Sequence, residues 1–140
     1  MCFRCHQDAH GAPFEVREAM LAIAHPSTAP PQAARPEYKT PRNLAFTPDG
    51  TEVWVACEAS GTVVVVDAVA RRAAAELEVG GQPTDVAFSP DGGLAWVSCR
   101  LDDEVAVVDV ATRRVVDRIP VGDEPHGLVT DADGRWLYVL

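Results

Sequence analysis

A repeat of 42 residues constrains the fold of this chain more than any other feature of its sequence. Proline recurs at positions 41, 83 and 125, and an Asp-Gly pair recurs at positions 49–50, 91–92 and 133–134. Residues 41–82 and 83–124 align without a gap and are identical at 17 of 42 positions. A third copy begins at Pro125 and runs to Leu140. The chain is therefore built from repeated structural units.

Each copy predicts four short antiparallel strands. In the first copy these are expected at residues 43–47, 52–57, 63–66 and 73–79. Pro48, Asp49 and Gly50 predict a turn after the first strand, because proline fixes φ and glycine adopts positive φ. The run Val63 to Val66 is apolar at every position, which is typical of a strand covered on both faces. A period of 40 to 45 residues with this content is typical of a β-propeller blade.

The number of copies defines the expected fold class. A propeller ring closes with about four to eight blades, and seven blades of this length need about 294 residues. We therefore predict an all-β partial β-propeller, with blades at 41–82 and 83–124, a truncated third at 125–140, and a short N-terminal helical flank. The missing remainder of its own propeller is an expected partner. Alone, such an arc exposes open strand edges and is prone to associate.

The second constraint is the sequence Cys-Phe-Arg-Cys-His at residues 2–6. Two thiols at this spacing can reach the two vinyl groups on one porphyrin edge, and the adjacent imidazole can bind the iron. We predict that Cys2 and Cys5 bind haem c covalently and that His6 is the proximal iron ligand. Residues 1–25 would form this haem-binding segment, which is too short for a complete cytochrome domain.

Three other interpretations of the same motif stay open. Cys2, Cys5 and His10 fit the start of a zinc knuckle, although Glu15 stands where the fourth ligand is expected. A redox dithiol normally follows a strand at the start of a helix, whereas only Met1 precedes this motif. Two free thiols in a surface loop are the third interpretation.

A helix and a linker are predicted after the motif. Residues 14–24 can form a short helix that begins just after Pro13. A haem that only carries electrons needs a second axial ligand, and Met20 or His25 is the candidate for this distal position. Residues 26–40 are rich in proline and predict an extended linker before the first blade.

Haem attachment also predicts the compartment. Haem is attached to this motif outside the cytoplasm, so we expect a periplasmic or otherwise extracytoplasmic protein. The motif leaves no room for an export signal, and we therefore expect that Met1 is not the natural start. No segment approaches the roughly 20 apolar residues of a membrane-spanning helix. The net charge of -9 disfavours nucleic acid as a partner and suits a basic redox partner.

The repeat resembles a known family. Residues 41–50, 54–57, 63–67 and 79–80 are similar to the YVTN-type β-propeller repeat, and the same segments recur at 96–99, 105–109 and 136–139. Ala56-Cys57 and Ser98-Cys99 stand where that family usually has Thr-Asn. Propellers of this kind fused to haem c segments resemble exported electron-transfer proteins and haem enzymes, among them nitrite reductases and peroxidase-linked propellers.

Three further pairs of residues gain a role from the repeat. Arg42 and His126 follow the first proline of their copies, where the chain enters the innermost strand near the central channel. They are the candidate channel-lining pair, although His126 could instead be a turn residue bonded to the backbone. The remaining cysteines, 57 and 99, are predicted to be small buried residues rather than a disulfide. Asp67 and Asp109 are predicted to close turns.

The expected function is electron transfer by an exported c-type haem protein with a propeller scaffold. One alternative is a haem-free binding or surface propeller. Another is a propeller enzyme that uses haem for redox chemistry, similar to the nitrite reductases or peroxidase-linked proteins. No phosphate-binding loop, nucleophile elbow or HExxH motif is present, so the sequence assigns no catalytic residue.

Overall fold

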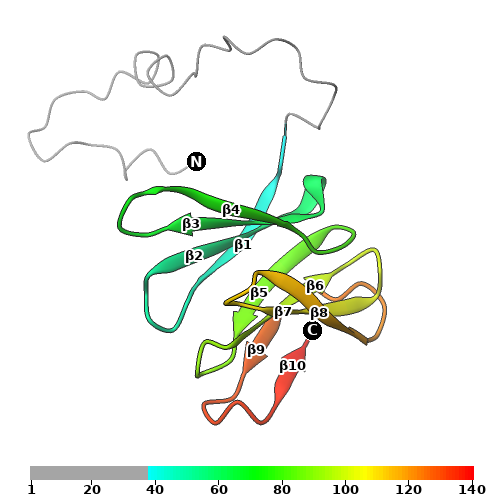
Figure 1. The fold of residues 1–140 in the computed structure, drawn as a ribbon. Helices are drawn as coiled ribbons and strands as arrows, with labels where there is room; N and C mark the ends of the chain where they lie inside the picture. Colours follow the sequence, from blue (N-terminus) through cyan, green and yellow to red (C-terminus); the bar gives the residue numbers. More distant parts are fainter. Residues whose placement is uncertain (1–37) are drawn as a thin grey trace, which may run out of the picture. The chain divides into compact units, whose positions relative to one another are not determined.

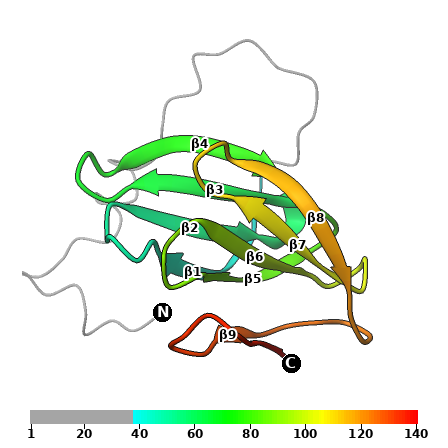
Figure 2. The ribbon, with the colours of Figure 1, turned by 60° about the horizontal axis from the view of Figure 1, so that its bottom comes forward.

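A computed structural model describes residues 38–140, and in this part the chain forms three antiparallel sheets (Figures 1 and 2). Blade 1 contains β1 (Pro41–Phe46), β2 (Glu52–Cys57), β3 (Thr62–Asp67) and β4 (Arg72–Glu78). Blade 2 contains β5 (Pro83–Phe88), β6 (Leu94–Cys99), β7 (Glu104–Asp109) and β8 (Arg114–Pro120). Blade 3 contains β9 (Leu128–Thr130) and β10 (Leu137–Val139). The strands follow chain order in each sheet, which confirms the predicted all-β partial propeller.

Several strand bounds differ from those expected from sequence by one or two residues, most of all at the start of the first strand. The first strand begins at Pro41 rather than Asn43, because a register shift between these residues lets proline open the ladder at its edge. The expected loop after β2 contains one 3-10 turn, η2 (Glu58–Ser60). The predicted helix at 14–24 lies outside the described residues. Among residues 38–140 no helix is long and apolar enough to cross a membrane.

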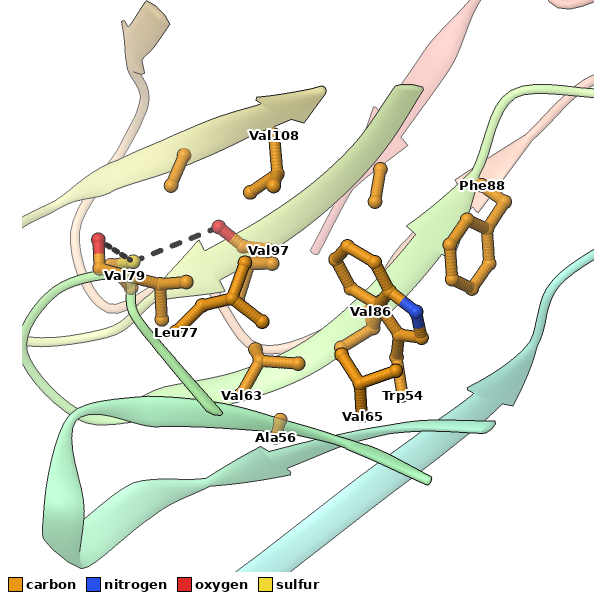
Figure 3. Packing of buried hydrophobic residues seen from close by; sticks show 13 residues of the cluster. Trp54, Ala56, Val63, Val65, Leu77, Val79, Val86, Phe88, Val97 and Val108 are labelled. Atoms are coloured by element: carbon orange, nitrogen blue, oxygen red, sulfur yellow. Dashed lines mark hydrogen bonds between the residues drawn. The ribbon is translucent and has the colours of Figure 1, made fainter. Parts of the chain in front are cut away.

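The hydrophobic core lies between blade 1 and blade 2 (Figure 3). Trp54 on β2 is fully buried and meets Phe88 on β5 edge to face, with 5.4 Å between the ring centroids. Val63 and Val65 on β3 are also fully buried, and point toward this seam. One face of β3 thus belongs to the core, whereas Val64 and Val66 on the other face are half-buried and not fully covered as the apolar run predicts.

Aspartates close the turns after β3 and β7. The N–H groups of Ala70 and Val69 donate to Asp67 Oδ1 at 2.7 and 2.8 Å. The N–H and the hydroxyl of Thr112 both donate to Asp109 Oδ1 at 2.7 Å. These bonds hold the pKa of both aspartates below the usual value. The predicted turn role of Asp67 and Asp109 is confirmed.

The turns after the first strands also use an aspartate. The Thr47 hydroxyl donates to Asp49 Oδ1 at 2.6 Å, and Asp91 accepts the equivalent bond in blade 2. In blade 3 the acceptor is Asp131, whose Oδ1 receives two backbone N–H groups at 2.7 and 3.0 Å. Asp133, the repeat equivalent of Asp49, lies in the same turn. The accepting carboxylate in blade 3 is instead that of Asp131, which is the repeat equivalent of Thr47.

We expect Asp109→Asn to lower the stability of the protein at neutral pH and to have little effect at strongly acidic pH. The Thr112 bonds favour the carboxylate, so their contribution is present above the ordinary aspartate pKa and is lost as pH falls through the lowered folded value. Urea unfolding of both proteins at pH 7 and near pH 2 measures this difference. Asp123→Asn, in an exposed loop, is the control, and an equal loss at both pH values would contradict the assignment.

Candidate functional site

The predicted haem-binding residues lie outside the part of the chain that the structure describes. These are Cys2, Cys5 and His6, together with the two distal candidates Met20 and His25. Their assignment stays a prediction from sequence. The described blades contain the other predicted pair, Arg42 and His126.

Arg42 and His126 stand at the inner ends of blade 1 and blade 3. Arg42 is exposed, and its Nε lies 3.2 Å from Glu58 Oε2. His126 is also exposed, and its backbone N–H donates to the carbonyl of Leu140 at 2.7 Å. Among residues 38–140 no hydrogen bond or ion pair joins Arg42 to His126. The two residues therefore occupy equivalent positions in their blades without a direct bond, and their role as channel-lining residues stays a prediction.

In blade 2, the equivalent position is part of a buried pair of hydroxyl groups. Thr84 stands at the repeat position of Arg42 and His126, and its Oγ1 lies 2.9 Å from Ser98 Oγ. The Thr84 hydroxyl also donates to the carbonyl of Pro125 at 3.1 Å. This position of the repeat is thus exposed in blades 1 and 3, and in blade 2 it is buried and joins neighbouring blades.

Asp85 is a residue that sequence reasoning missed. Its side chain is 9% exposed and lies on the innermost strand of blade 2. Asp85 Oδ1 accepts a bond from Asn43 Nδ2 at 2.7 Å, and Oδ2 accepts one from the N–H of Leu128 at 2.8 Å. One carboxylate therefore connects three successive blades. The sequence does contain a signal for this residue, because a polar residue stands just before apolar strand residues at the equivalent positions 43 and 85.

Arg100 is the second missed residue. Its Nη1 donates to Gln82 Oε1 at 3.1 Å and its Nη2 to Glu124 Oε2 at 2.9 Å. The bond to Glu124 raises the pKa of the guanidinium, and Glu58 acts in the same direction. Gln82 and Glu124 both have positive φ, of 51° and 52°, so two strained backbone positions present the side chains that hold Arg100. Arg100 therefore lies between two acidic side chains, Glu58 and Glu124, that belong to different parts of the repeat.

A cleft of about 340 Å³ opens between the two blades at the opposite ends of these strands. Its lining includes Asp49 and Asp91 from the two turns, and the ion pair of Arg113 with Glu52. The two atoms of that pair, Nη2 and Oε1, are 2.5 Å apart, and Glu52 Oε2 also accepts the indole N–H of Trp54. Within residues 38–140 no three metal-ligating side chains are grouped to hold a metal ion. The lining of the cleft is therefore polar and includes a cross-blade ion pair.

The two cysteines in the blades are free and buried, as predicted. Burial raises the pKa of Cys99 to about 11, and it also raises the pKa of Cys57. Cys99 Sγ lies 3.6 Å from the carbonyl oxygen of Val79 on the preceding blade. Both thiols are protonated at neutral pH and serve packing.

Residues 20–140 match the sequence profile of the family described as lactonase, 7-bladed beta-propeller. Among solved structures, hydrazine synthase of Kuenenia stuttgartiensis is 29% identical with a TM-score of 0.73, over 79% of this chain and 32% of that chain. A putative 6-phosphogluconolactonase of Bacteroides uniformis is 23% identical with a TM-score of 0.66, over 82% and 38%. Another, of Bacteroides fragilis, is 25% identical with a TM-score of 0.65, over 72% and 32%. No curated protein matches the chain at a significant level.

The shares of the solved structures that are covered also show how much of a propeller the chain spans. It covers 32% to 38% of the length of the three solved structures. The catalytic or binding residues of those larger proteins are therefore not transferred to this arc.

Proposed function

The chain belongs to the lactonase family of seven-bladed β-propellers, and we propose that it uses this scaffold in an electron-transfer protein that carries haem c at Cys2, Cys5 and His6. The Cys-x-x-Cys-His spacing is the observation that carries the proposal. The blades would form a rigid platform beside the redox centre. The acidic chain, with a net charge of -9, would favour a basic redox partner outside the cytoplasm.

The donor set of the motif fits haem c. Two thiols provide the thioether bonds and an imidazole provides an iron ligand, with Met20 or His25 as the distal candidate. When bound, the haem iron would accept and release one electron. The remaining cysteines do not compete for attachment, because Cys57 and Cys99 are buried with raised pKa values.

Hydrolysis of a lactone is a second candidate function. It is favoured by the family description and by the printed names of the two Bacteroides proteins. Arg42 and His126 would be the first residues to consider for a substrate at the inner ends of the blades. The similarity to a hydrazine synthase argues against assigning this activity from the fold, because one propeller scaffold accompanies different chemistries.

We expect the protein to contain one covalent haem after expression in a periplasm that has a cytochrome c maturation system. The haem should survive acid-acetone extraction, give a sharp reduced α-band and add the mass of one haem. Cys2→Ala with Cys5→Ala should abolish all three signals, because both thioether bonds are lost. Cys57→Ala is the matched control, since it removes a thiol outside the motif and should leave attachment unchanged.

Lactone turnover separates the two functions. A colourless protein with the bare polypeptide mass would contradict the haem proposal when a control cytochrome matures in the same cells. If that colourless protein hydrolysed 6-phosphogluconolactone, the second function would replace the first. If haem is present, binding of carbon monoxide or cyanide would identify an open iron position, whereas a six-coordinate carrier would resist it.

A further inference from the structure

Three Asp-Gly pairs occupy equivalent turns of the repeat, and their aspartates differ in how they are held. The pairs lie at residues 49–50, 91–92 and 133–134, one in each blade. All three aspartates are exposed, and all three glycines have positive φ, of 72°, 74° and 67°. The same dipeptide therefore occurs three times in a similar backbone, and the hydrogen bonds of the carboxylates distinguish the copies.

In blades 1 and 2 the aspartate carboxylate is fixed within its own turn. The Thr47 hydroxyl donates to Asp49 Oδ1 at 2.6 Å, and the N–H of Thr51 donates to the same atom at 3.0 Å. In blade 2 the equivalent hydroxyl and N–H donate to Asp91 Oδ1 at 2.6 and 3.0 Å. These bonds lower the pKa of both aspartates, so both side chains stay ionised and oriented.

In blade 3 the carboxylate of Asp133 is free, because Asp131 takes its role. Asp131 stands at the repeat position of Thr47 and accepts two backbone N–H groups of the turn at 2.7 and 3.0 Å. Within the described part of the chain no hydrogen bond or ion pair holds the Asp133 side chain. Each position that supplies a donor to Asp49 or Asp91 has its equivalent in this turn, so the difference originates from residue 131.

We propose that Asp133 is a site of spontaneous isomerisation to isoaspartate in the folded protein, whereas Asp49 and Asp91 are protected. The nitrogen of Gly134 attacks Cγ of Asp133, so that an N–Cγ bond forms and a Cγ–O bond breaks. Water leaves, formed from the carboxyl OH and the amide proton. A water molecule then adds to the main-chain carbonyl carbon of this succinimide and breaks its bond to the nitrogen, so the chain continues through Cγ. The product has the same composition as the starting chain, and no oxidant is consumed.

The reaction requires a side chain that can rotate onto the following nitrogen. For Asp49 and Asp91 two bonds to Oδ1 must break first. Their lowered pKa values also make the protonated form, which loses water, rarer. The attacking amide is held less closely in blade 3, because Gly134 N lies 3.1 Å from the Asp131 carbonyl oxygen and the equivalent distance is 2.8 Å in both other turns. Glycine has no Cβ to hinder the attack.

Peptide mapping of the aged whole chain tests this difference. After incubation at neutral pH and body temperature, trypsin places the three aspartates in separate peptides, 43–71, 73–100 and 119–135. Labelling with an isoaspartyl methyltransferase measures isoaspartate in each peptide. Asp133 should isomerise at least about tenfold faster than Asp49 and Asp91, because no bond to its carboxylate has to break. In unfolding concentrations of urea the three rates should converge, since the turns no longer hold the side chains.

Asp131→Thr gives blade 3 the hydroxyl that blade 1 has, and should slow the isomerisation of Asp133 to the range of Asp49. Asp123→Thr makes the same substitution in an exposed loop and should leave the rate at Asp133 unchanged. Circular dichroism checks that each variant folds. If Asp131→Thr does not fold, Thr47→Ala replaces it and should accelerate the reaction at Asp49. Equal rates at the three aspartates of the folded protein, or a folded variant with unchanged rates, would overturn the proposal.

Discussion

Replacing Gly80 by alanine is expected to destabilise the protein by about 3 to 5 kcal/mol. Gly80 lies in the connection from blade 1 to blade 2 with φ of +149°, which side chains rarely permit. A Cβ atom here would stand 2.6 Å from Asp102 Oδ2 and 2.8 Å from Cys99 Sγ. Cys99 is fully buried, so it cannot move away without disturbing the core.

The neighbouring bonds explain why this connection cannot relax. Asp102 Oδ2 accepts the N–H of Gly81 at 2.6 Å, and Arg118 Nη2 donates to the carbonyl of Val79 at 2.9 Å. Blade 2 thus holds the connecting chain on both sides of Gly80. Moving the backbone to accommodate a methyl group would break these contacts between blades.

Gly122 provides a matched control within the same chain. It is the repeat equivalent of Gly80, yet a Cβ atom there would have no other heavy atom within 4 Å. Gly122→Ala should therefore change stability by no more than about 1 kcal/mol. Urea unfolding followed by circular dichroism measures both values. Equal effects of the two substitutions would show that the contact with blade 2 is not the cause.

This pair of glycines shows where prediction from the sequence ends. The repeat places Gly80 and Gly122 at equivalent positions and predicts the same turn for both. Gly80 is enclosed by Cys99 and Asp102 of the following blade, and the repeat equivalents of these two residues would lie after Leu140. Strands, turns and the buried cysteines follow from local pattern and periodicity, and the structure confirms them. Contacts between blades depend on how one sheet packs against another, which residue spacing does not specify.

The candidate site residues also divide into those that the sequence pattern identifies and those that only the contacts between blades reveal. Arg42 and His126 are candidates because they follow the first proline of their copies, where the chain enters the innermost strand, and both are exposed in the structure. Asp85 and Arg100 were missed, because their partners are 42 or 43 and 18 to 24 residues away. Polar residues that join blades differ from copy to copy, so their partners cannot be read from one repeat alone.

Asp85→Ala is expected to destabilise the protein by about 2 to 3 kcal/mol. The substitution leaves the amide of Asn43 and the N–H of Leu128 without the carboxylate that accepts both. Asp85 is buried, and Leu128 is half-buried, so water replaces these bonds only in part. Because the two donors belong to blades 1 and 3, the loss should also make unfolding of the arc less cooperative.

A double-mutant cycle isolates the part of this loss that belongs to the contact between blades. Asn43→Ala alone should cost less than Asp85→Ala, because Asn43 is exposed and donates to only one oxygen of the carboxylate. Combined, the substitutions should cost less than their sum, with a coupling of at least about 0.5 kcal/mol. Asp117→Ala, on the exposed outer strand β8, is the matched control and should stay within about 0.5 kcal/mol of wild type. Strict additivity would mean that Asp85 stabilises blade 2 by itself and that the bond from Asn43 contributes nothing to joining the blades.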